Sequence, residues 1–386
     1  MDLLLSGFHA EYFLEGYASV FLEFSNLLTL MWKPDKVYVT NVNQRGVNIN
    51  LVISDLYTHL SKRVNTVIEV YDIMYPLDEL IGAVLRGLRK AEVMMLSWKP
   101  HPSFSIILNR ISNEISGYNS KLIMFVYSLN YLEKVLKSLK LKDAGSEVVI
   151  LNPYCDIDRG LLKLIRVLPP VHTIFLQKGS KVLREKSIDK GRVTFRFMGR
   201  FQEGRGIKEV ITAFKRFKIK RPEARAELII DSFSEDIETE EVFKLYGGDI
   251  RMVITNPIKH VKEGDSSPRQ VIEEITYKYA YSSYVVLPYT KPVHITPSLT
   301  LLEALATGSF VIATKEATSI LHRDVRGHVF VVDTRNIVEE LVKTFEYLYE
   351  EHDSNFYWRI RSNAHKYAYN NFSYVSITKT LKAKLT

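Results

Sequence analysis

The sequence is almost free of cysteine, since Cys155 is the only one in 386 residues. One thiol excludes an intrachain disulfide and any metal site built from several cysteines, and we expect no metal centre. Scarcity of cysteine fits a reducing compartment, so we expect a cytoplasmic protein. The default role of Cys155 is that of a small buried hydrophobe.

Long apolar runs are also missing. No uninterrupted apolar stretch approaches about 18 residues, so a membrane-spanning helix is not expected. The first 21 residues contain Asp2 and no lysine or arginine, unlike a secretory signal. We therefore interpret residues 3–5 as the first core strand.

Acidic residues are outnumbered by basic ones. The chain contains 44 Asp and Glu and 52 Lys and Arg, which gives a net charge of +8. This balance favours an anionic partner such as nucleic acid, an anionic lipid surface or a phosphorylated metabolite. No stretch interleaves a Lys/Arg cluster with aromatic residues, so nucleic acid is the least favoured of these partners and we expect none.

Apolar residues make up 46% of the chain, and 386 residues exceed what one hydrophobic core usually supports. Short apolar runs alternate with helical stretches, which is typical of buried parallel strands joined by helices. The predicted strands are 3–5, 36–40, 50–54, 67–71, 93–96, 121–127, 148–151, 193–198, 227–230, 251–254, 284–287, 310–313 and 329–332. The predicted helices are 76–89, 103–115, 130–142, 207–216, 272–281 and 337–349. The fold class is therefore α/β, with two Rossmann-like, doubly wound domains.

A change of composition near the middle of the chain indicates the domain boundary. Pro169 and Pro170, Gly179 and the charged stretch 181–190 predict a linker. We place an N-terminal domain at 1–165, the linker at 166–191, a second domain at 192–365 and a C-terminal helix at 366–386.

Glycines and cations gather where the strand 193–198 passes into the helix 207–216. The glycines are Gly199, Gly204 and Gly206, and the cations are Arg200, Arg205 and Lys208. Close backbone approach, free N–H groups and positive charge together favour a phosphate or pyrophosphate site. The alternative is a basic, solvated loop, and we favour the phosphate site because packing gives no reason for glycine and arginine to coincide there.

A second strand, loop and helix follow at 284–314, with one carboxylate, Glu303, inside the helix. We predict that Thr296 caps this helix, that Pro297 opens it and that Gly308 ends it. In the alternative, Thr300 and Glu303 form a capping box and the glutamate only satisfies a backbone N–H. We favour the earlier start, which leaves Glu303 free to face a ligand at the carboxyl end of a strand.

Two isolated residues in the N-terminal half are weaker candidates for a cleft or acceptor site. Gly7 follows the first strand, where it would let the backbone approach a ligand closely, although a plain strand-to-helix connection also explains it. His101 stands between two prolines, and a turn residue is the favoured interpretation over an acid–base catalyst.

The predicted helix 130–142 has one apolar face, formed by Leu132, Val135, Leu136 and Leu139, with lysines around it. Such a helix can lie on an anionic membrane surface. An ordinary surface helix packed on the sheet explains the pattern somewhat better.

The second half of the chain resembles retaining nucleotide-sugar glycosyltransferases of the GT-B class, in particular the family GT4. Residues 199–206 resemble its G-R-L-x-x-E-K-G segment, with Arg205 in place of lysine. The stretch LLEALATGSFVIA at 301–313 resembles the end of its E-x7-E element and the A-x-A-x-G-x-P-V-I-A run after it. Residues 326–330, 371–373 and, faintly, 149–156 resemble further family signatures.

The resemblance implies two domains facing each other across a cleft, with a C-terminal helix that returns to the first domain. It implies that Glu303 accepts hydrogen bonds from ribose and that Arg200 and Arg205 hold a diphosphate. Further expected donor-binding residues are Gly199, Gly204, Gly206, His294, Thr296, Ser298, Leu299 and Thr300. The expected reaction moves a hexose, with retention, from a nucleoside-diphosphate sugar to a hydroxyl of a glycan or membrane glycolipid. No tightly bound cofactor is expected, and the protein is expected in the cytoplasm or peripherally on the inner membrane face.

Two positions depart from the family pattern. Ile295 stands eight residues before Glu303, where the family has its first glutamate, and Asp231 opens a segment where a glycine-rich turn is common. The departure at Ile295 supports an alternative function, a catalytically weakened GT-B protein that binds a sugar nucleotide or glycan.

Overall fold

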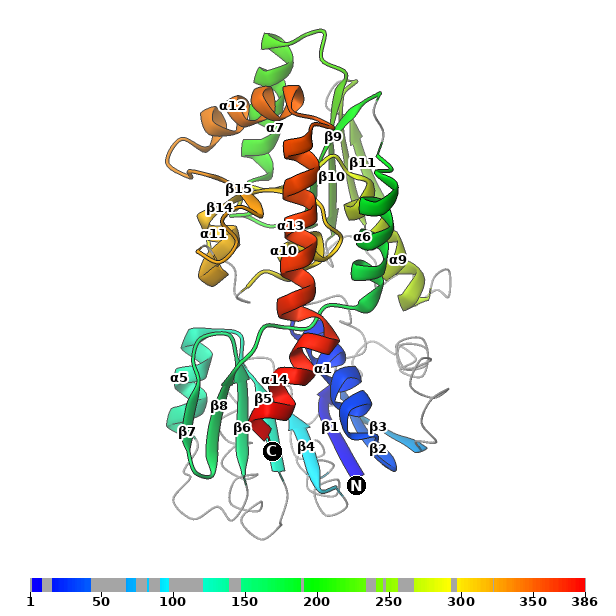
Figure 1. The fold of residues 1–386 in the computed structure, drawn as a ribbon, viewed down its shortest axis with the longest axis vertical. Helices are drawn as coiled ribbons and strands as arrows, with labels where there is room; N and C mark the ends of the chain where they lie inside the picture. Colours follow the sequence, from blue (N-terminus) through cyan, green and yellow to red (C-terminus); the bar gives the residue numbers. More distant parts are fainter. Residues whose placement is uncertain are drawn as a thin grey trace. The chain divides into compact units, whose positions relative to one another are not determined.

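The computed structural model describes residues 2–8, 16–42, 67–73, 82, 91–96, 121–138, 147–188, 191–233, 241–245, 248–255, 267–292, 297–321 and 323–385. They form two compact units (Figure 1). Unit 1 comprises Met1–Pro170, Ser267–Arg269 and Tyr374–Thr386, and unit 2 comprises Val171–Ser266 and Gln270–Ser373. Several predicted features lie outside the described residues. They are the strand 50–54, the helix 103–115, the residues His101, His294, Ile295 and Thr296, and the helix 76–89, of which only Gly82 is described.

Unit 1 is built on an eight-stranded sheet in the order β3-β2-β1-β4-β5-β6-β8-β7. The strands are β1 (Asp2–Phe8), β2 (Lys36–Val42), β3 (Val67–Ile73), β4 (Val93–Leu96), β5 (Lys121–Phe125), β6 (Val148–Asn152), β7 (Ile157–Arg159) and β8 (Leu162–Arg166). Neighbouring strands pair in parallel, and only β7 runs antiparallel, to β8. The register between β1 and β2 shifts between Ser6 and Phe8, so Gly7 lies at an irregularity at the end of β1.

Helix α1 (Gly16–Trp32) packs on this sheet and also buries a carboxylic acid. The ring of Phe24 stacks on Phe125 of β5 at 5.8 Å between centroids. Glu23 on the same helix is only 5% exposed, and the hydroxyl of Tyr374 donates a hydrogen bond to it. Burial raises the pKa of Glu23 to about 8, and the bond from Tyr374 opposes this rise only in part. Tyr374 opens the last helix, α14 (Tyr374–Leu385), which belongs to unit 1.

Helix α5 (Leu129–Ser138) covers the stretch for which a membrane contact was considered, up to residue 138. Leu132 and Val135 are 4% and 1% exposed, so these two apolar side chains are buried within the protein. Lys134 and Lys137 are exposed. The packing favours the ordinary surface helix, because the buried apolar side chains are not available to lipid. Among the described residues, no helix is long and apolar enough to cross a membrane.

Unit 2 is built on a seven-stranded sheet in the order β11-β12-β10-β9-β13-β14-β15. The strands are β9 (Val193–Arg200), β10 (Ala226–Phe233), β11 (Glu241–Leu245), β12 (Ile250–Thr255), β13 (Tyr284–Leu287), β14 (Phe310–Thr314) and β15 (Val329–Val332). They are parallel apart from β11. All six parallel strands were predicted, and they confirm the doubly wound α/β fold class for this half.

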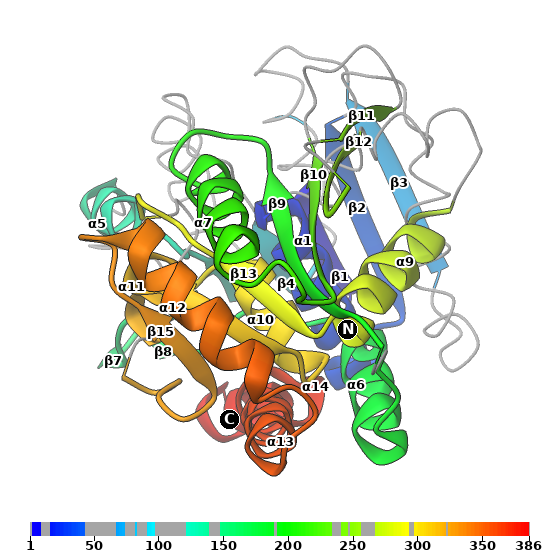
Figure 2. The same cartoon turned by 90° about the horizontal axis from the view of Figure 1, so that it is seen from above.

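Helices cover both faces of the unit 2 sheet (Figure 2). The helices α7 (Ile207–Lys220) and α12 (Ile337–Glu350) pack against each other on one face. On the other side lie α6 (Thr173–Glu185), α9 (Pro268–Tyr281), α10 (Leu299–Ala306) and α13 (Asn355–Phe372), of which α13 contacts both α6 and α10. Two short helices, α11 (Lys315–Thr318) and η2 (Ser319–Leu321), follow β14.

Aromatic rings fill the core beneath α7 and α12. Phe195 on β9 has its ring centroid 4.5 Å from that of Phe345 and 5.1 Å from that of Tyr284. Phe214 and Phe217 of α7 meet the same ring edge-on. All five side chains are fully buried, so this cluster fixes the helix pair on the sheet.

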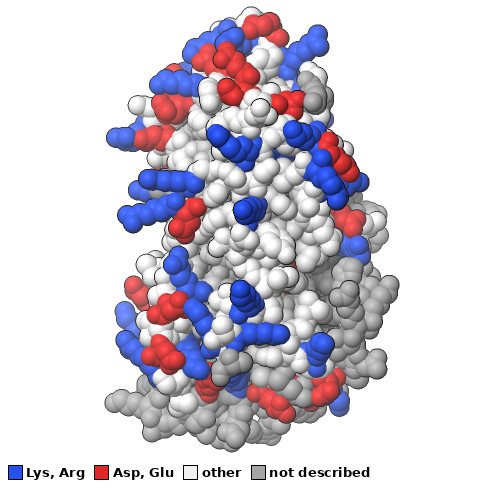
Figure 3. Space-filling view, in the orientation of Figure 1, with Lys and Arg blue, Asp and Glu red and all other residues white. Residues whose placement is uncertain are grey.

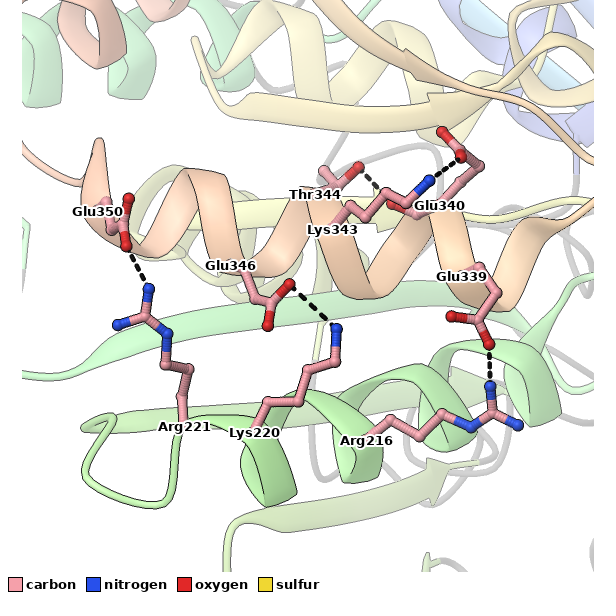
Figure 4. A network of polar contacts seen from close by, with 9 residues as sticks. All are labelled: Arg216, Lys220, Arg221, Glu339, Glu340, Lys343, Thr344, Glu346 and Glu350. Atoms are coloured by element: carbon pink, nitrogen blue, oxygen red, sulfur yellow. Dashed lines mark hydrogen bonds and ion pairs between the residues drawn. The ribbon is translucent and has the colours of Figure 1, made fainter.

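The solvent edge of this helix pair is joined by ion pairs (Figure 4). Arg216 pairs with Glu339, Lys220 with Glu346 and Arg221 with Glu350. Figure 3 shows positive and negative side chains intermingled over this part of unit 2. Exposed pairs of this kind contribute roughly 0–1 kcal/mol each, so the aromatic core, not the charges, dominates the packing.

Two predictions about element boundaries were wrong. The segment 166–191, predicted as a linker, contains the 13-residue helix α6, whose buried residues include Phe175, Gly179 and Val182. Helix α10 begins at Leu299 with Ser298 at its N-cap, so neither Thr296 nor Thr300 caps it and Pro297 does not open it. Glu303 is consequently the fifth residue of the helix, two positions beyond the place that a capping box requires.

Candidate active site

The chain order of unit 2 reverses at β9, so the switch point of the sheet lies at the carboxyl ends of β9 and β13. From β9 the chain passes through α7 to β10 on one side, and it later returns through α9 to β13 on the other side. Open α/β sheets bind ligands at such a switch point. The loops that follow the two strands are the glycine-rich loop, residues 199–206, and the segment 288–292.

Gly206 joins these two loops. A Cβ atom at this position would lie 1.9 Å from the carbonyl oxygen of Pro288, and the backbone has φ +73°. The carbonyl of Gly204 accepts hydrogen bonds from the N–H groups of Thr290, at 2.9 Å, and Lys291, at 3.3 Å. Glycine is therefore required at 206 for the two loops to approach each other, and Gly206 also forms the N-cap of α7.

Arg205 lies over a buried aromatic ring of the neighbouring loop. Its guanidinium carbon is 4.6 Å from the ring centroid of Tyr289, which is 1% exposed. The hydroxyl of Thr314, at the end of β14, donates to the carbonyl of Tyr289 at 2.7 Å. The ring thus provides a fixed platform that holds a half-buried cation at the carboxyl edge of the sheet.

Arg200 is the last residue of β9 and lies at the same edge, on the side of β10. Its guanidinium carbon is 6.0 Å from the ring centroid of Phe233, the last residue of β10. The hydroxyl of Ser232 donates to the carbonyl of Gly199 at 2.8 Å and ties the two strand ends together. The two predicted phosphate-binding cations therefore lie near the two ends of the glycine-rich loop.

Glu303 projects from α10, and its carboxylate meets a tyrosine from another helix. The hydroxyl of Tyr279, near the end of α9, lies 3.5 Å from Oε2 of Glu303 and donates to it. The side chain of Thr300 is a further polar neighbour of the same tyrosine. Burial, first, and then the nearby charge of Glu303 hold the pKa of Tyr279 well above its usual value. Tyr279 therefore stays a neutral donor.

The N-terminus of α10 contains three of the predicted donor-binding residues. Ser298 is buried, and its side chain makes no capping bond with the described residues, while its carbonyl accepts from the N–H groups of Leu301 and Leu302. Leu299 and Thr300 are half-exposed at the first two helical positions. The first N–H groups of a helix point out of its end, so this terminus can receive an anion.

The far end of α10 is held almost entirely through backbone carbonyls. Arg361 of α13 is fully buried and donates to the carbonyls of Gly308 at 2.6 Å and Ala280 at 2.7 Å. His365 Nδ1 lies 2.7 Å from the carbonyl oxygen of Ala306. A Cβ at Gly179 of α6 would lie 2.6 Å from the same carbonyl oxygen. These contacts clamp the helix, so Glu303 stands on a rigid support.

Asp231, which departs from the family pattern, is inside β10 and not in a turn. It pairs with Arg196 of β9 and lies 3.5 Å from the ammonium of Lys278. Arg196 also donates to the hydroxyl of Ser282 at 2.7 Å. The aspartate is thus part of an ion-pair group between the sheet and α9.

The structure brings together Arg205 and Glu303 through two buried tyrosines, which the sequence analysis did not single out. Tyr289 contacts Arg205, Tyr279 contacts Glu303, and the nearby Tyr289 contributes to the raised pKa of Tyr279. Short-range patterns do not reveal this cluster, because its members come from α9, the loop after β13 and α10. The binding roles of all these residues stay predictions, and so does the expected absence of a metal and a cofactor. The predicted cleft or acceptor roles of Gly7 and His101 in unit 1 also stay predictions.

Solved structures share this architecture over the whole chain. HepE from Anabaena, solved in complex with UDP and glucose, has a TM-score of 0.63 at 13% identity and covers 100% of this chain and 99% of its own. This chain has the GT-B fold. A glycosyltransferase from Rickettsia africae gives a TM-score of 0.62 at 14% identity, with 99% of this chain and 97% of its own covered. Sucrose-phosphate synthase from Thermosynechococcus elongatus gives 0.59 at 12% identity, with 100% and 98% covered.

No protein-family model matches the sequence, and no curated protein matches it. The GT-B fold of this chain is accordingly recognised through its three-dimensional arrangement. At 12–14% identity the likeness concerns the fold, and the chemistry has to be argued from the site itself.

Proposed function

We propose that this GT-B chain transfers a hexose from a nucleoside-diphosphate sugar to a hydroxyl group of a glycan or glycolipid acceptor, with retention of anomeric configuration. The observation that carries the proposal is the contact at Gly206, which aligns the glycine-rich loop with the segment 288–292. That contact places Arg205 over the buried ring of Tyr289, at the carboxyl edge of the sheet.

Each proposed role follows from the chemistry of the donor. Cleavage of the sugar–phosphate bond builds negative charge on the departing nucleoside diphosphate, and fixed cations stabilise that charge in the transition state. Arg200 and Arg205 supply these cations at the carboxyl edge of the sheet, and glycine allows the backbone to approach the phosphates. Glu303 accepts hydrogen bonds from the ribose hydroxyls, which orients the donor.

In the proposed retaining reaction, the acceptor hydroxyl attacks on the face from which the diphosphate leaves. The departing phosphate oxygen takes the acceptor proton, so this step requires no carboxylate base from the protein. HepE has been solved with UDP and with UDP-glucose, which favours UDP as the first nucleotide to test.

The test is an assay of turnover with UDP-glucose, UDP-galactose, GDP-mannose and ADP-glucose as donors. The quantity measured is the nucleoside diphosphate that is released. We expect wild-type protein to turn over one of these donors. Arg205→Ala should lower kcat for that donor about a hundredfold. If the donor is a UDP-sugar, the affinity of the variant for uridine should be unchanged. Lys343→Ala on α12 is the matched control, because it removes an exposed cation of the same unit. An unchanged kcat in Arg205→Ala would remove this arginine from the mechanism.

A binding module without transferase activity is the second candidate, favoured by Ile295 in place of a carboxylate. Binding of one donor without turnover, with any acceptor or water, would establish it. We further propose that contact with an acceptor membrane is electrostatic and uses the exposed Lys134 and Lys137 of α5.

A further inference from the structure

A tyrosine beneath the predicted ribose contact is fixed more firmly than the carboxylate it meets. Tyr279 is 2% exposed, whereas Glu303 is half-buried. Its hydroxyl lies 3.5 Å from Oε2 of Glu303, and Thr300, one turn earlier on α10, is a second polar neighbour of the tyrosine. A phenol of α9 therefore meets the carboxylate of α10 directly.

The backbone of α9 at Tyr279 and Ala280 is held by hydrogen bonds from other segments of unit 2. The hydroxyl of Ser309 donates to the carbonyl of Tyr279 at 2.9 Å, and Thr307 lies 2.8 Å from Ser309. Arg361 holds the carbonyl of the next residue, Ala280. The phenol ring also packs against Phe175 of α6, with centroids 6.3 Å apart. The position of the Tyr279 hydroxyl is thus set by three separate elements.

A carboxylate on a flexible side chain has two oxygens and several rotamers. A neutral phenol that donates to Oε2 selects one rotamer and leaves Oε1 as an acceptor for a ligand. The raised pKa of Tyr279, caused first by burial and then by Glu303, keeps the phenol proton in place at any physiological pH.

We propose that Tyr279 is a positioning residue that orients Glu303 toward the ribose diol, so that the site selects ribonucleoside diphosphates over forms lacking the ribose hydroxyls. This inference rests on the proposed function, because it takes a nucleoside diphosphate as the ligand. A site whose buried polar groups are arranged for a hydroxyl rejects the analogue without it, since those groups then stay unpaired.

The experiment measures nucleotide affinity by calorimetry with UDP, GDP and ADP and with their 2′,3′-dideoxy counterparts. Wild-type protein should bind one ribonucleotide at least about tenfold more tightly than its dideoxy form, because hydrogen bonds to a charged group contribute on that scale. Tyr279→Phe keeps the ring and removes the hydroxyl. It should reduce the preference to within about threefold, by weakening ribonucleotide binding and leaving dideoxynucleotide binding unchanged.

Two further variants separate positioning from general stability. Tyr284→Phe is the matched control: Tyr284 is fully buried in the same unit and its hydroxyl donates to the carbonyl of Leu348, so it should keep the full ribose preference. Thr300→Val should lower the preference in the same direction as Tyr279→Phe, and it serves if Tyr279→Phe does not fold.

The outcomes distinguish this inference from the proposed function. A ribose preference that Tyr279→Phe and Thr300→Val both retain overturns the positioning role and leaves the proposed function standing. Equal binding of ribo and dideoxy forms by wild type overturns the positioning role and the ribose contact of Glu303, and it leaves the proposed transfer reaction standing. Absence of binding of every nucleotide by wild type overturns both.

Discussion

The buried acid Glu23 makes the stability of unit 1 depend on pH in a direction opposite to that of most carboxylates. Its pKa is raised by burial from 4.5 to about 8, and Tyr374 donates a hydrogen bond to it. Between these pH values the folded protein keeps a proton that the unfolded chain releases. The free energy of unfolding should therefore fall as pH rises through this window.

The size of the effect follows from the same shift. Each pH unit between the unfolded and folded pKa values changes the free energy of unfolding by about 1.4 kcal/mol. The contribution of Glu23 is complete below pH 4.5 and is lost as the pH rises toward about 8. Glu23→Gln removes the titrating group and keeps an oxygen that accepts from Tyr374, so the variant should lack this slope.

Urea unfolding followed by far-UV circular dichroism at pH 5.5, 6.5 and 7.5 measures the slope in both proteins. His328 and His365 are half-buried, and this partial burial lowers their pKa values, so both favour the folded state more as pH rises toward 6.5. Their contributions cancel in the difference between wild type and variant. Glu133→Gln, at an exposed glutamate of α5, should follow wild type. Parallel pH profiles for wild type and Glu23→Gln would refute the assignment of a buried, protonated Glu23.

Two further variants test other parts of the molecule. Gly206→Ala should destabilise the protein by more than about 2 kcal/mol and abolish nucleotide binding, because its Cβ would overlap the Pro288 carbonyl. Thermal unfolding measures this, and Gly248→Ala, where no atom of the described residues lies within 4 Å of the added Cβ, should match wild type. Replacing Lys134 and Lys137 together by glutamate should abolish sedimentation with phosphatidylserine vesicles at low salt and leave stability unchanged. Equal sedimentation of the double variant and wild type would contradict a role for α5 on membranes.

Strand positions were predictable where apolar runs were continuous. The runs at 284–287 and 93–96 match β13 and β4 at both ends, because strands buried on both faces carry an apolar side chain at nearly every position. Their alternation with helices was enough to predict a parallel, doubly wound sheet. The glycine-rich loop was also predictable, since its three glycines adopt positive φ values that other residues rarely adopt.

Helix ends and long-range contacts were not predictable to the same degree. A proline at 297 after a threonine is a common start signal, yet Pro297 lies outside α10, which begins at Leu299 and contacts both α6 and α13. The prolines and lysines around α6 suggested a linker and obscured the helical spacing of its buried residues, Phe175, Gly179 and Val182. Tyr279 and Tyr289 acquire their importance only through packing between distant segments.

The buried guanidinium of Arg361 suggests why such an arrangement can persist while sequences diverge. Two of its three hydrogen-bond partners are main-chain oxygens, those of Gly308 and Ala280, and the third is the hydroxyl of Tyr357. Every amino acid supplies a carbonyl, so exchange of the side chain at 280 leaves that bond available. A helix fastened in this way keeps its place while most side chains around it change, provided that the arginine itself stays.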